Sequence, residues 1–379
     1  MEARPSKFLV VGNGNITKAL LAILDSLGEN RAISVCDIKD GRSGEETIAG
    51  RSGEFDAVIN LSSAPTGPLI DLCARHGLPY MDAAFEWIGS GQYPAERYAA
   101  ELWNDLRPRP EIPVLHGFGM NPGLVEAITA IYAPGRPHLA VEFDYDTARA
   151  RPDAPAVWGT WSPATFFEET YEVPGTVSVP GELFLPVPEA LHHHLRVPTA
   201  DGTFDFSAVV HDETAYMTLA DANCRGAVFL YSAPAALKEY FSSHPGLSPA
   251  ERAAVPVVHD LEGGETVGVA FYDGSENVRC VFNHADHARV FSRLGVNGTC
   301  WQTACGAYAG MKLLAAAKPG ESLTVSAAMR TAPYREIVMD ALERVGFSLE
   351  SRDGLVTADA IRRTVLPLFG GRAGKEFAA

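Results

Sequence analysis

Short apolar runs alternate with amphipathic segments over the first third of the chain. We predict strands where short segments are mostly apolar and β-branched, and helices where apolar residues recur every three or four positions. The predicted strands cover residues 7–11, 32–36, 55–61, 78–82 and 112–116, and the predicted helices cover 19–27, 68–76, 94–106 and 124–132. This order is typical of a doubly wound α/β domain with a parallel sheet.

The pattern changes near residue 139 to alternating apolar and polar positions, which is typical of strands that bury one face. Strands are predicted at 139–145, 204–210, 227–231, 266–271 and 278–282, and helices around 163–171, 234–241 and 249–254. We therefore predict an inserted α+β domain with a mostly antiparallel sheet over residues 139–296. Helical patterns follow at 299–317, 325–329, 334–345 and 357–368. Residues 297–379 are predicted to pack back on the first domain.

A glycine-rich turn joins the first predicted strand to the first predicted helix. Gly12 allows a tight turn, and Gly14 lets the backbone approach a pyrophosphate held at the helix N-terminus. Asn15 and Ile16 begin the helix beside that position. Thr17 stands where the dinucleotide-binding fingerprint has its third glycine, which mainly serves helix–strand packing.

Asp37 ends the second predicted strand, 23 residues after Gly14. This is near the spacing at which a carboxylate binds the ribose hydroxyls of a dinucleotide, and a carboxylate there repels a 2′-phosphate. The third strand ends, at the edge where ligands gather, in two serines that we also assign to the cofactor site, Ser62 and Ser63. We therefore predict that residues 1–138 form a Rossmann domain that binds NAD in preference to NADP.

Composition changes this picture in only a few ways. The 379 residues carry a formal net charge of −16, which disfavours nucleic acid and anionic membranes as partners and suits a cationic small molecule. No apolar run reaches the roughly 18 residues of a membrane span, and a strand begins by Phe8, so we expect a cytoplasmic protein without a signal peptide. The six cysteines form no CxxC pair and are predicted to be free thiols.

Two polar residues follow strand ends in the first predicted domain. Glu86 comes just after a strand and is a candidate partner for an ammonium group. Asn121 precedes Pro122, which holds the asparagine backbone extended, so its amide is a candidate for orienting an amine or a nicotinamide. The alternatives are a loop cap for Glu86 and a simple Asn-Pro-Gly turn for Asn121.

The second predicted domain adds four candidates. Glu169 lies on a predicted helix, where solvated charges are also common. His211 and Glu213 are predicted to end an alternating strand with both side chains on one face, as an acid/base pair. Glu265 precedes another strand. Acids around a nicotinamide suit a cationic amine, so the sequence favours an enzyme that oxidises or reduces a carbon–nitrogen bond.

Several motifs resemble the saccharopine dehydrogenase-like superfamily: the strand followed by GxGxxT, the segment Asp82–Trp87 and the segment Gly119–Val125. Within it the chain is most similar to the bacterial homospermidine synthases, because further signatures of that family occur in matching order. They are Thr160-Trp161-Ser162 with Glu169 nine residues after the threonine, His211-Asp212-Glu213, Glu265 ahead of a Gly-Val strand, and Asn297-Gly-Thr299 followed by Gln302.

The resemblance implies an NAD-dependent enzyme that oxidises an amine to an imine, transfers the amine and reduces the new imine. The catalytic residues that it implies are Glu86, Asn121, Glu169, His211, Glu213 and Glu265, and the class suggests a homodimer. Two features depart from the family. Val177–Gly181 occupies about the place of its Gly-Trp-Gly turn, and Ala64 stands where it has an aspartate. We therefore expect an amine other than unmodified putrescine as the preferred substrate.

Two other functions remain open from the sequence. An NAD(P)-dependent amino-acid dehydrogenase of the saccharopine, opine or carboxyspermidine type needs a basic residue for a substrate carboxylate, and the candidates are Arg149, Arg151 and Arg196. The basic residues Lys39 and Arg42, close to Asp37, keep NADP open as its cofactor. A non-catalytic Rossmann protein that senses NAD(H) is the second alternative.

We predict no metal site. The adjacent histidines at 192–194 scatter their side chains and are expected at the surface. His284 and His287 fit one helical face, but no second ligand cluster accompanies them. Trp158 and Trp161 either form a cation–π wall for an amine or belong to a core.

Overall fold

The computed structural model describes residues 7–29, 33–37, 44–86, 95–188, 195–373 and 377. The chain divides into two compact units, each described here by itself. The first unit takes Met1–Gly91, Glu96–Ala127 and Cys300–Ser348, and the second takes Gln92–Ala95, Ile128–Thr299 and Leu349–Ala379. Within the described ranges, no helix combines the length and apolar character that crossing a membrane requires.

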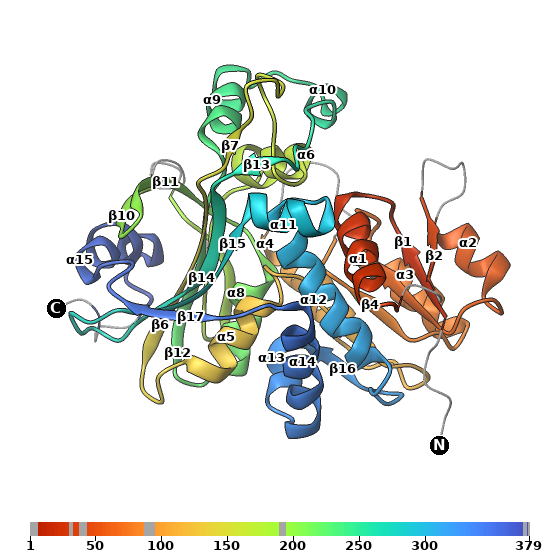
Figure 1. Ribbon diagram of the computed structural model, residues 1–379. Coiled ribbons are helices and arrows are strands. Elements are labelled where there is room, and N and C mark those ends of the chain that lie inside the picture. Colours follow the sequence, from red (N-terminus) through yellow and green to blue (C-terminus); the bar gives the residue numbers. More distant parts are fainter. Residues whose placement is uncertain are drawn as a thin grey trace. The chain divides into compact units, whose positions relative to one another are not determined.

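The first unit is built on a six-stranded sheet in the order β16-β5-β4-β3-β1-β2 (Figure 1). Its strands are β1 (Phe8–Val11), β2 (Ile33–Cys36), β3 (Ala57–Asn60), β4 (Tyr80–Asp82), β5 (Val114–His116) and β16 (Ser322–Thr324). Every neighbouring pair is parallel, which confirms the predicted doubly wound α/β fold. All residues of β1 and β3 are buried, as expected for parallel strands covered on both faces.

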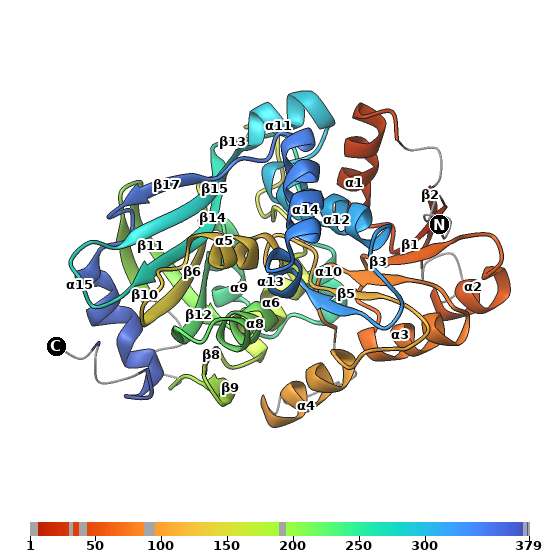
Figure 2. The same cartoon turned by 90° about the horizontal axis from the view of Figure 1, so that it is seen from below.

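Helices that contribute to this unit are α1 (Asn15–Ser26), α2 (Gly44–Arg51), α3 (Thr66–Arg75), α4 (Ala95–Asp105), α5 (Leu124–Tyr132), α12 (Gly298–Leu314), α13 (Val325–Met329) and α14 (Ala332–Val345). Ile48 of α2 and Leu69 of α3 share a core with Val11 and Val58, so these two helices cover the same face of the sheet (Figure 2). The buried carboxylate of Glu126, in α5, accepts a hydrogen bond of 2.8 Å from the Ser326 amide in the first turn of α13.

The second unit contains a nine-stranded sheet in which β10-β11-β12-β6-β14-β15-β17 are neighbours in this order and β8 and β9 extend from β12. Its strands are β6 (His138–Asp146), β8 (Thr176–Val179), β9 (Glu182–Pro186), β10 (Leu195–Thr199), β11 (Gly202–Val209), β12 (Cys224–Ser232), β14 (Gly264–Tyr272), β15 (Arg279–Asp286) and β17 (Glu350–Asp353). Among the described strands of this sheet, β12 and β6 pair in parallel and the other pairs are antiparallel, so the prediction of a mostly antiparallel sheet is confirmed. The short strands β7 (Arg149–Ala150) and β13 (Leu261–Glu262) pair separately.

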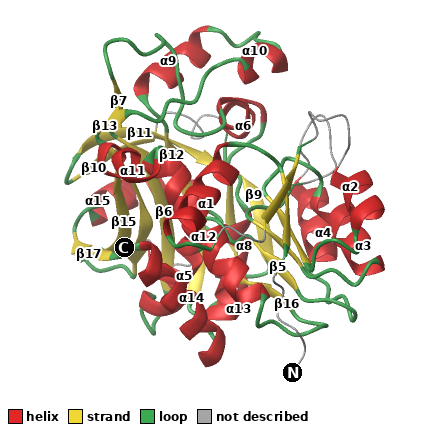
Figure 3. Ribbon diagram, turned by 45° about the vertical axis from the view of Figure 1, so that its right-hand side comes forward, coloured by secondary structure: helices red, strands yellow, loops and turns green. Residues whose placement is uncertain are grey.

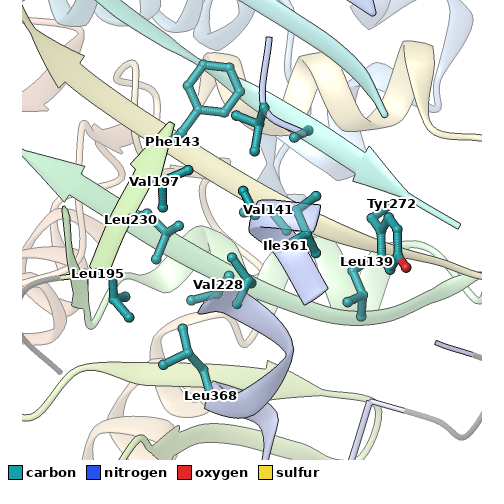
Figure 4. Packing of buried hydrophobic residues seen from close by; sticks show 14 of the residues in the cluster. Leu139, Val141, Phe143, Leu195, Val197, Val228, Leu230, Tyr272, Ile361 and Leu368 are labelled. Atoms are coloured by element: carbon teal, nitrogen blue, oxygen red, sulfur yellow. The ribbon is translucent and has the colours of Figure 1, made fainter. Parts of the chain in front are cut away.

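One face of this sheet packs against the C-terminal residues. Val141 and Phe143 of β6 and Leu230 of β12 share a core with Ile361 and Leu368 (Figure 4). These last two residues belong to a helical segment made of α15 (Ala358–Ala360), a π-helical turn (Ile361–Val365) and a 3-10 turn (Leu366–Phe369).

The predicted domain division needs one correction. Residues 349–379 belong to the second unit, whereas they were predicted to pack back on the first domain together with 297–348. The physical reason is that β17 pairs with β15 and the apolar side chains after it complete the second unit's core. The chain passes between the units at 127/128 and 299/300, close to the predicted boundaries at 138/139 and 296/297.

At one end of the second sheet lie α6 (Pro163–Phe167) and α9 (Ala235–Ser243), with α10 (Pro249–Ala253) close by (Figure 3). Phe166 of α6 and Phe241 of α9 pack with Phe229 and Tyr231 of β12 in a separate apolar cluster. The remaining helices of this unit are α8 (Asp212–Ala220) and α11 (His287–Leu294). The acidic residues of β6 described below alternate with the residues of the C-terminal core and point to the other face of the sheet.

Candidate functional site

The glycine turn of the first unit leaves space beside its backbone. Gly12 has a φ of +105°, and a Cβ on it would lie 2.6 Å from the carbonyl oxygen of Leu61, just after β3. Only glycine fits both the conformation and this contact. Gly14 is the N-cap of α1, and a Cβ there would meet nothing within 4 Å. No side chain of the N-cap covers the first amides of α1, so the helix start is suited to binding an anion.

Thr17, which stands where the motif usually has its third glycine, makes a hydrogen bond that the sequence did not predict. Its buried hydroxyl donates a hydrogen bond of 2.8 Å to the carbonyl oxygen of Gly12. The side chain therefore ties the first turn of α1 to the glycine turn. The departure from the usual third glycine stabilises this loop through a hydrogen bond.

Asp37 lies directly after β2, and the amide of Gly12 donates a hydrogen bond of 2.8 Å to the carbonyl oxygen of Cys36. This bond places the end of β2 beside the glycine turn. The position agrees with the predicted role of Asp37 at a ribose. Lys39 and Arg42 lie outside the described residues.

The serines after β3 shape their own loop. The buried side-chain oxygen of Asn60 accepts hydrogen bonds from the Ser62 amide (3.1 Å) and the Ser62 hydroxyl (2.7 Å). The Ser62 hydroxyl in turn accepts one from the Ala64 amide. Ser62 therefore holds the loop that faces Gly12, while Ser63 is exposed. Asn60 is a contributor that the sequence analysis missed, although its place at a strand end could have indicated it.

Glu86 is held by its backbone at the start of α3. Its amide donates to the Thr66 hydroxyl, and its carbonyl oxygen accepts from the Thr66 amide, both at 2.8 Å. The half-buried side chain lines a surface pocket of about 320 Å³ together with other acids and one arginine, Asp71, Arg97, Glu101 and Asp105. Burial raises the pKa of Asp105 to about 6. Trp87, which follows Glu86 in the sequence motif, lies outside the described residues.

Asn121 lies in a tight loop after β5, where the Asn121–Pro122 bond is cis. The Gly119 amide donates to the Pro122 carbonyl oxygen at 3.0 Å, and a Cβ on Gly119 would lie 2.8 Å from the Ala83 carbonyl oxygen. A Cβ on Gly306 of α12 would lie 2.0 Å from the Gly119 carbonyl oxygen. The loops that carry Glu86 and Asn121 therefore touch through glycines at one edge of the first sheet.

In the second unit, the predicted strand end at His211 and Glu213 is wrong. The strand β11 ends at Val209, and His211 is the N-cap of α8, whose first turn holds Asp212 and Glu213. Acidic residues are favourable at a helix N-terminus, which explains why the helix begins here. The two side chains still meet, because Nδ1 of His211 lies 2.5 Å from Oε2 of Glu213.

The charge of Glu169 interacts with the charges of His211 and Glu213. It lies on a π-helical turn (Glu168–Glu172), a geometry frequently found at functional sites. Burial raises the pKa of Glu169 to about 7, and the charge of His211 opposes this rise. Burial disfavours protonation of His211, but Glu213, followed by Glu169 and Asp212, raises its pKa to about 10. Burial and the charge of Glu213 raise the pKa of Asp212 to about 7. The structure therefore brings together three of the predicted residues as one proton-binding cluster.

Glu265 belongs to a different group from this cluster. It lies on β14 opposite Asp146 of β6, and the alternate residues of β6 on the same face are also acidic, Glu142 and Asp144. All four side chains are buried. Burial, with the charges of Asp144 and Asp146, raises the pKa of Glu265 well above its ordinary value. The sequence analysis missed the three acids of β6, although the alternation Val-Glu-Phe-Asp-Tyr-Asp carried the signal.

The structure bears on two further sequence interpretations. His284 lies on β15 and His287 begins α11, so they do not share a helical face. The reason is that the Asp286 side chain caps α11 by accepting from the Arg289 amide, which starts the helix only after His284. Trp161 is partly buried and packs against the apolar cluster of Phe166 and Tyr231, and its Nε1 donates a hydrogen bond of 2.7 Å to the Tyr231 hydroxyl. The histidines at 192–194 lie outside the described residues.

Comparison of the sequence with protein-family models and with curated proteins gives no match. Two solved structures that share the fold illustrate the likeness. The homospermidine synthase of Legionella pneumophila, in complex with NAD, aligns with a TM-score of 0.66 and 13% identity over 91% of this chain and 91% of that chain. Apo saccharopine dehydrogenase (L-Glu forming) of Saccharomyces cerevisiae aligns with a TM-score of 0.57 and 12% identity, over 93% and 100%. The likeness extends over both units and establishes a shared fold.

Proposed function

We propose that this chain is an NAD-dependent enzyme that acts on a carbon–nitrogen bond of an amine, of the homospermidine synthase or saccharopine dehydrogenase type. The observation that carries the proposal is the cluster of Glu169, His211 and Glu213, which combines buried acids with a protonated imidazole. The two structural neighbours, one of them in complex with NAD, support it. We also propose a cytoplasmic homodimer.

The glycine turn fits a dinucleotide. The open space beside Gly14 and the uncapped start of α1 suit a pyrophosphate, with Asn15 and Ile16 in that first turn. Asp37 suits the ribose hydroxyls of NAD. When bound, the nicotinamide supplies the hydride exchange that interconverts an amine and an imine.

The acids of the second unit suit the amine partner. A protonated amine must lose a proton before the carbon beside its nitrogen can give up a hydride. Glu169, whose pKa is about 7, is suited to take that proton near neutral pH. The resulting iminium carries a positive charge, which Glu213 and its neighbours stabilise by Coulomb attraction in a site with little water. His211 is protonated at neutral pH and limits the repulsion among these acids.

The amino-acid dehydrogenase alternative has less support. Its candidate arginines have exposed side chains and pair with surface acids, Arg149 with Glu262, Arg151 with Asp260 and Glu262, and Arg196 with Asp205. A sensor that only binds NAD(H) gives no reason for an acid with a pKa near 7 beside a protonated histidine.

A turnover screen tests the proposal. The full chain is incubated with NAD or NADP and with putrescine, spermidine, carboxylated polyamines and lysine-like amino acids, and reduced nicotinamide is followed by absorbance. We expect amine-dependent turnover with NAD that falls at least a hundredfold in Glu169→Gln, while the adjacent exposed control Glu168→Gln retains it. NAD binding without turnover on any amine would support the sensor instead. Turnover confined to carboxylated substrates would support the amino-acid dehydrogenase.

A further inference from the structure

Two buried hydroxyl groups connect a strand of the second unit to the start of α8. Ser178 lies in β8 between two valines, and Thr214 lies in the first turn of α8. Both residues have an exposed fraction of 0%, and their side-chain oxygens are 3.0 Å apart. Burying a hydroxyl group costs free energy unless it is hydrogen-bonded, so the partners of these two groups show what they do. We name Ser178 and Thr214 the hydroxyl pair.

The hydrogen bonds of the hydroxyl pair run in one direction. The Thr214 hydroxyl donates its single proton to the carbonyl oxygen of His211 at 2.8 Å, so its oxygen accepts from the Ser178 hydroxyl. The Ser178 oxygen accepts in turn from the Phe184 amide at 3.3 Å. An ordered series of hydrogen bonds therefore leads from β9 through β8 to the backbone of His211.

The backbone of Phe184 has an unusual conformation where it meets the hydroxyl pair. Its φ is +53°, a left-handed conformation that a bulky residue rarely adopts, and the residue is buried. The register of β8 with β9 shifts between Val177 and Val179, so that two residues of β9 lie opposite Ser178 as a β-bulge. Strained backbone of this kind persists where the surrounding structure requires it, frequently near functional groups.

His211 depends on this support because it is an unusual N-cap. An N-cap side chain usually accepts a hydrogen bond from an amide in the first turn of its helix, but within the described chain the imidazole makes no such bond. Its Nδ1 lies instead 2.5 Å from Oε2 of Glu213. The amide and the hydroxyl of Thr214 both donate to the His211 carbonyl oxygen. The backbone that orients the imidazole is therefore held by the hydroxyl pair.

We propose that the two residues of the hydroxyl pair are positioning residues, which hold the backbone of His211 so that its imidazole stays against Glu213. The hydrogen-bond geometry stands by itself, and the consequence for turnover rests on the proposed function. If the backbone is released, the distance between the imidazole and the carboxylate grows and their attraction weakens. The groups that face the imidazole are Glu169 from the π-helical turn, Asp212 and Glu213 from α8, and the ring of Phe229 from β12.

Variants that remove one hydroxyl group test the proposal on the full chain without changing a charge. Ser178→Ala and Thr214→Val interrupt the series of hydrogen bonds, whereas Thr214→Ser keeps it. The matched control is Thr218→Val, one turn further along α8. The Thr218 hydroxyl is also buried, but it donates to backbone carbonyl oxygens of its own helix.

NMR titration of the His211 ring is the first measurement. We expect its pKa to fall from about 10 by about one pH unit or more in Ser178→Ala and Thr214→Val, because burial then outweighs more of the attraction to Glu213. In amine turnover, kcat should fall at least fivefold with KM changed less than twofold. The alkaline limb of the pH profile should move to lower pH, since His211 loses its charge earlier. Thr214→Ser and Thr218→Val should keep the pKa and kcat of the unaltered chain.

The outcomes separate this inference from the proposed function. A His211 pKa that stays near 10 in both variants overturns the positioning role, and so does an equal fall in Thr218→Val, which would show a general loosening of α8. A lowered pKa in a chain that turns over no amine supports the hydroxyl pair and overturns the function. Unchanged pKa values with amine turnover intact overturn the pair's role and leave the function standing.

Circular dichroism and thermal unfolding identify a variant that fails to fold, and the other variant then decides. If both fail, Ser178→Cys decides, because cysteine has nearly the size of serine but is a weak hydrogen-bond donor.

Discussion

The replacement Glu213→Gln tests the electrostatic basis of the acid cluster. Glutamine keeps the size of the side chain at the start of α8 and can still hydrogen-bond to His211, but it removes the negative charge. In the structure, the charge and hydrogen bond of Glu213 are the main causes that raise the His211 pKa, while burial acts against them. Removing the charge should therefore let burial dominate.

The size of the effect follows from the pKa values. A rise from 6.5 to about 10 corresponds to roughly 5 kcal/mol in favour of protonated His211. In Glu213→Gln the pKa of His211 should fall well below 10, with Glu169 and Asp212 still favouring the charged form. Because the folded-state pKa of His211 is raised, its contribution to stability is complete below about pH 6.5 and disappears as pH rises toward about 10. The variant should lose this pH-dependent contribution.

NMR titration of the His211 ring, assigned by comparison with His211→Ala, measures the pKa directly. Thermal unfolding between pH 6 and pH 10 measures the linked stability. The control is Glu239→Gln, an exposed glutamate of α9 in the same unit. A His211 pKa that stays near 10 in Glu213→Gln would refute the assignment of Glu213 as its main partner.

Three further predictions concern the first unit. Gly12→Ala should destabilise the fold by about 2–4 kcal/mol, because its Cβ would collide with a carbonyl at a positive φ, whereas Gly14→Ala should leave the melting temperature unchanged and weaken NAD binding in calorimetry. Glu86→Gln should lower amine turnover at least tenfold with unchanged NAD affinity, since the backbone bonds to Thr66 remain; equal turnover would make Glu86 structural. Asp37→Ala should narrow the preference for NAD over NADP by about 1–3 kcal/mol, and tighter NADP binding by the unaltered chain would contradict the ribose role.

Sequence patterns identify strands and helices well where a whole face is apolar. The glycine turn and the parallel strands of the first unit follow from such patterns. Ser322–Thr324 was not predicted as β16, because three half-buried residues show no periodicity. Likewise, His211 and Glu213 follow an apolar strand closely enough to seem part of it, and only the N-cap geometry shows that they start a helix.

The acids of β6, Glu142, Asp144 and Asp146, show a different limit. Alternation of apolar and acidic residues along β6 normally indicates one buried face and one face in water. Here both faces are buried, because every residue of β6 is buried in the assembled unit. Covering a strand is a tertiary event, and the residues that do it come from segments far away in the sequence. The same alternation can therefore belong to a strand with one exposed face or to a strand buried on both faces, and the folded structure is needed to tell which.

The way the chain divides between its two units has a consequence for synthesis on the ribosome. The first unit cannot complete its sheet until β16 emerges, about 200 residues after β5, and the second cannot close its apolar core until Ile361 and Leu368 follow. Nascent chains of this protein thus carry uncovered strands for most of their synthesis, when misassembly and aggregation are most probable. Synthesis rate and chaperone supply should accordingly affect its yield more than the stability of the finished fold does.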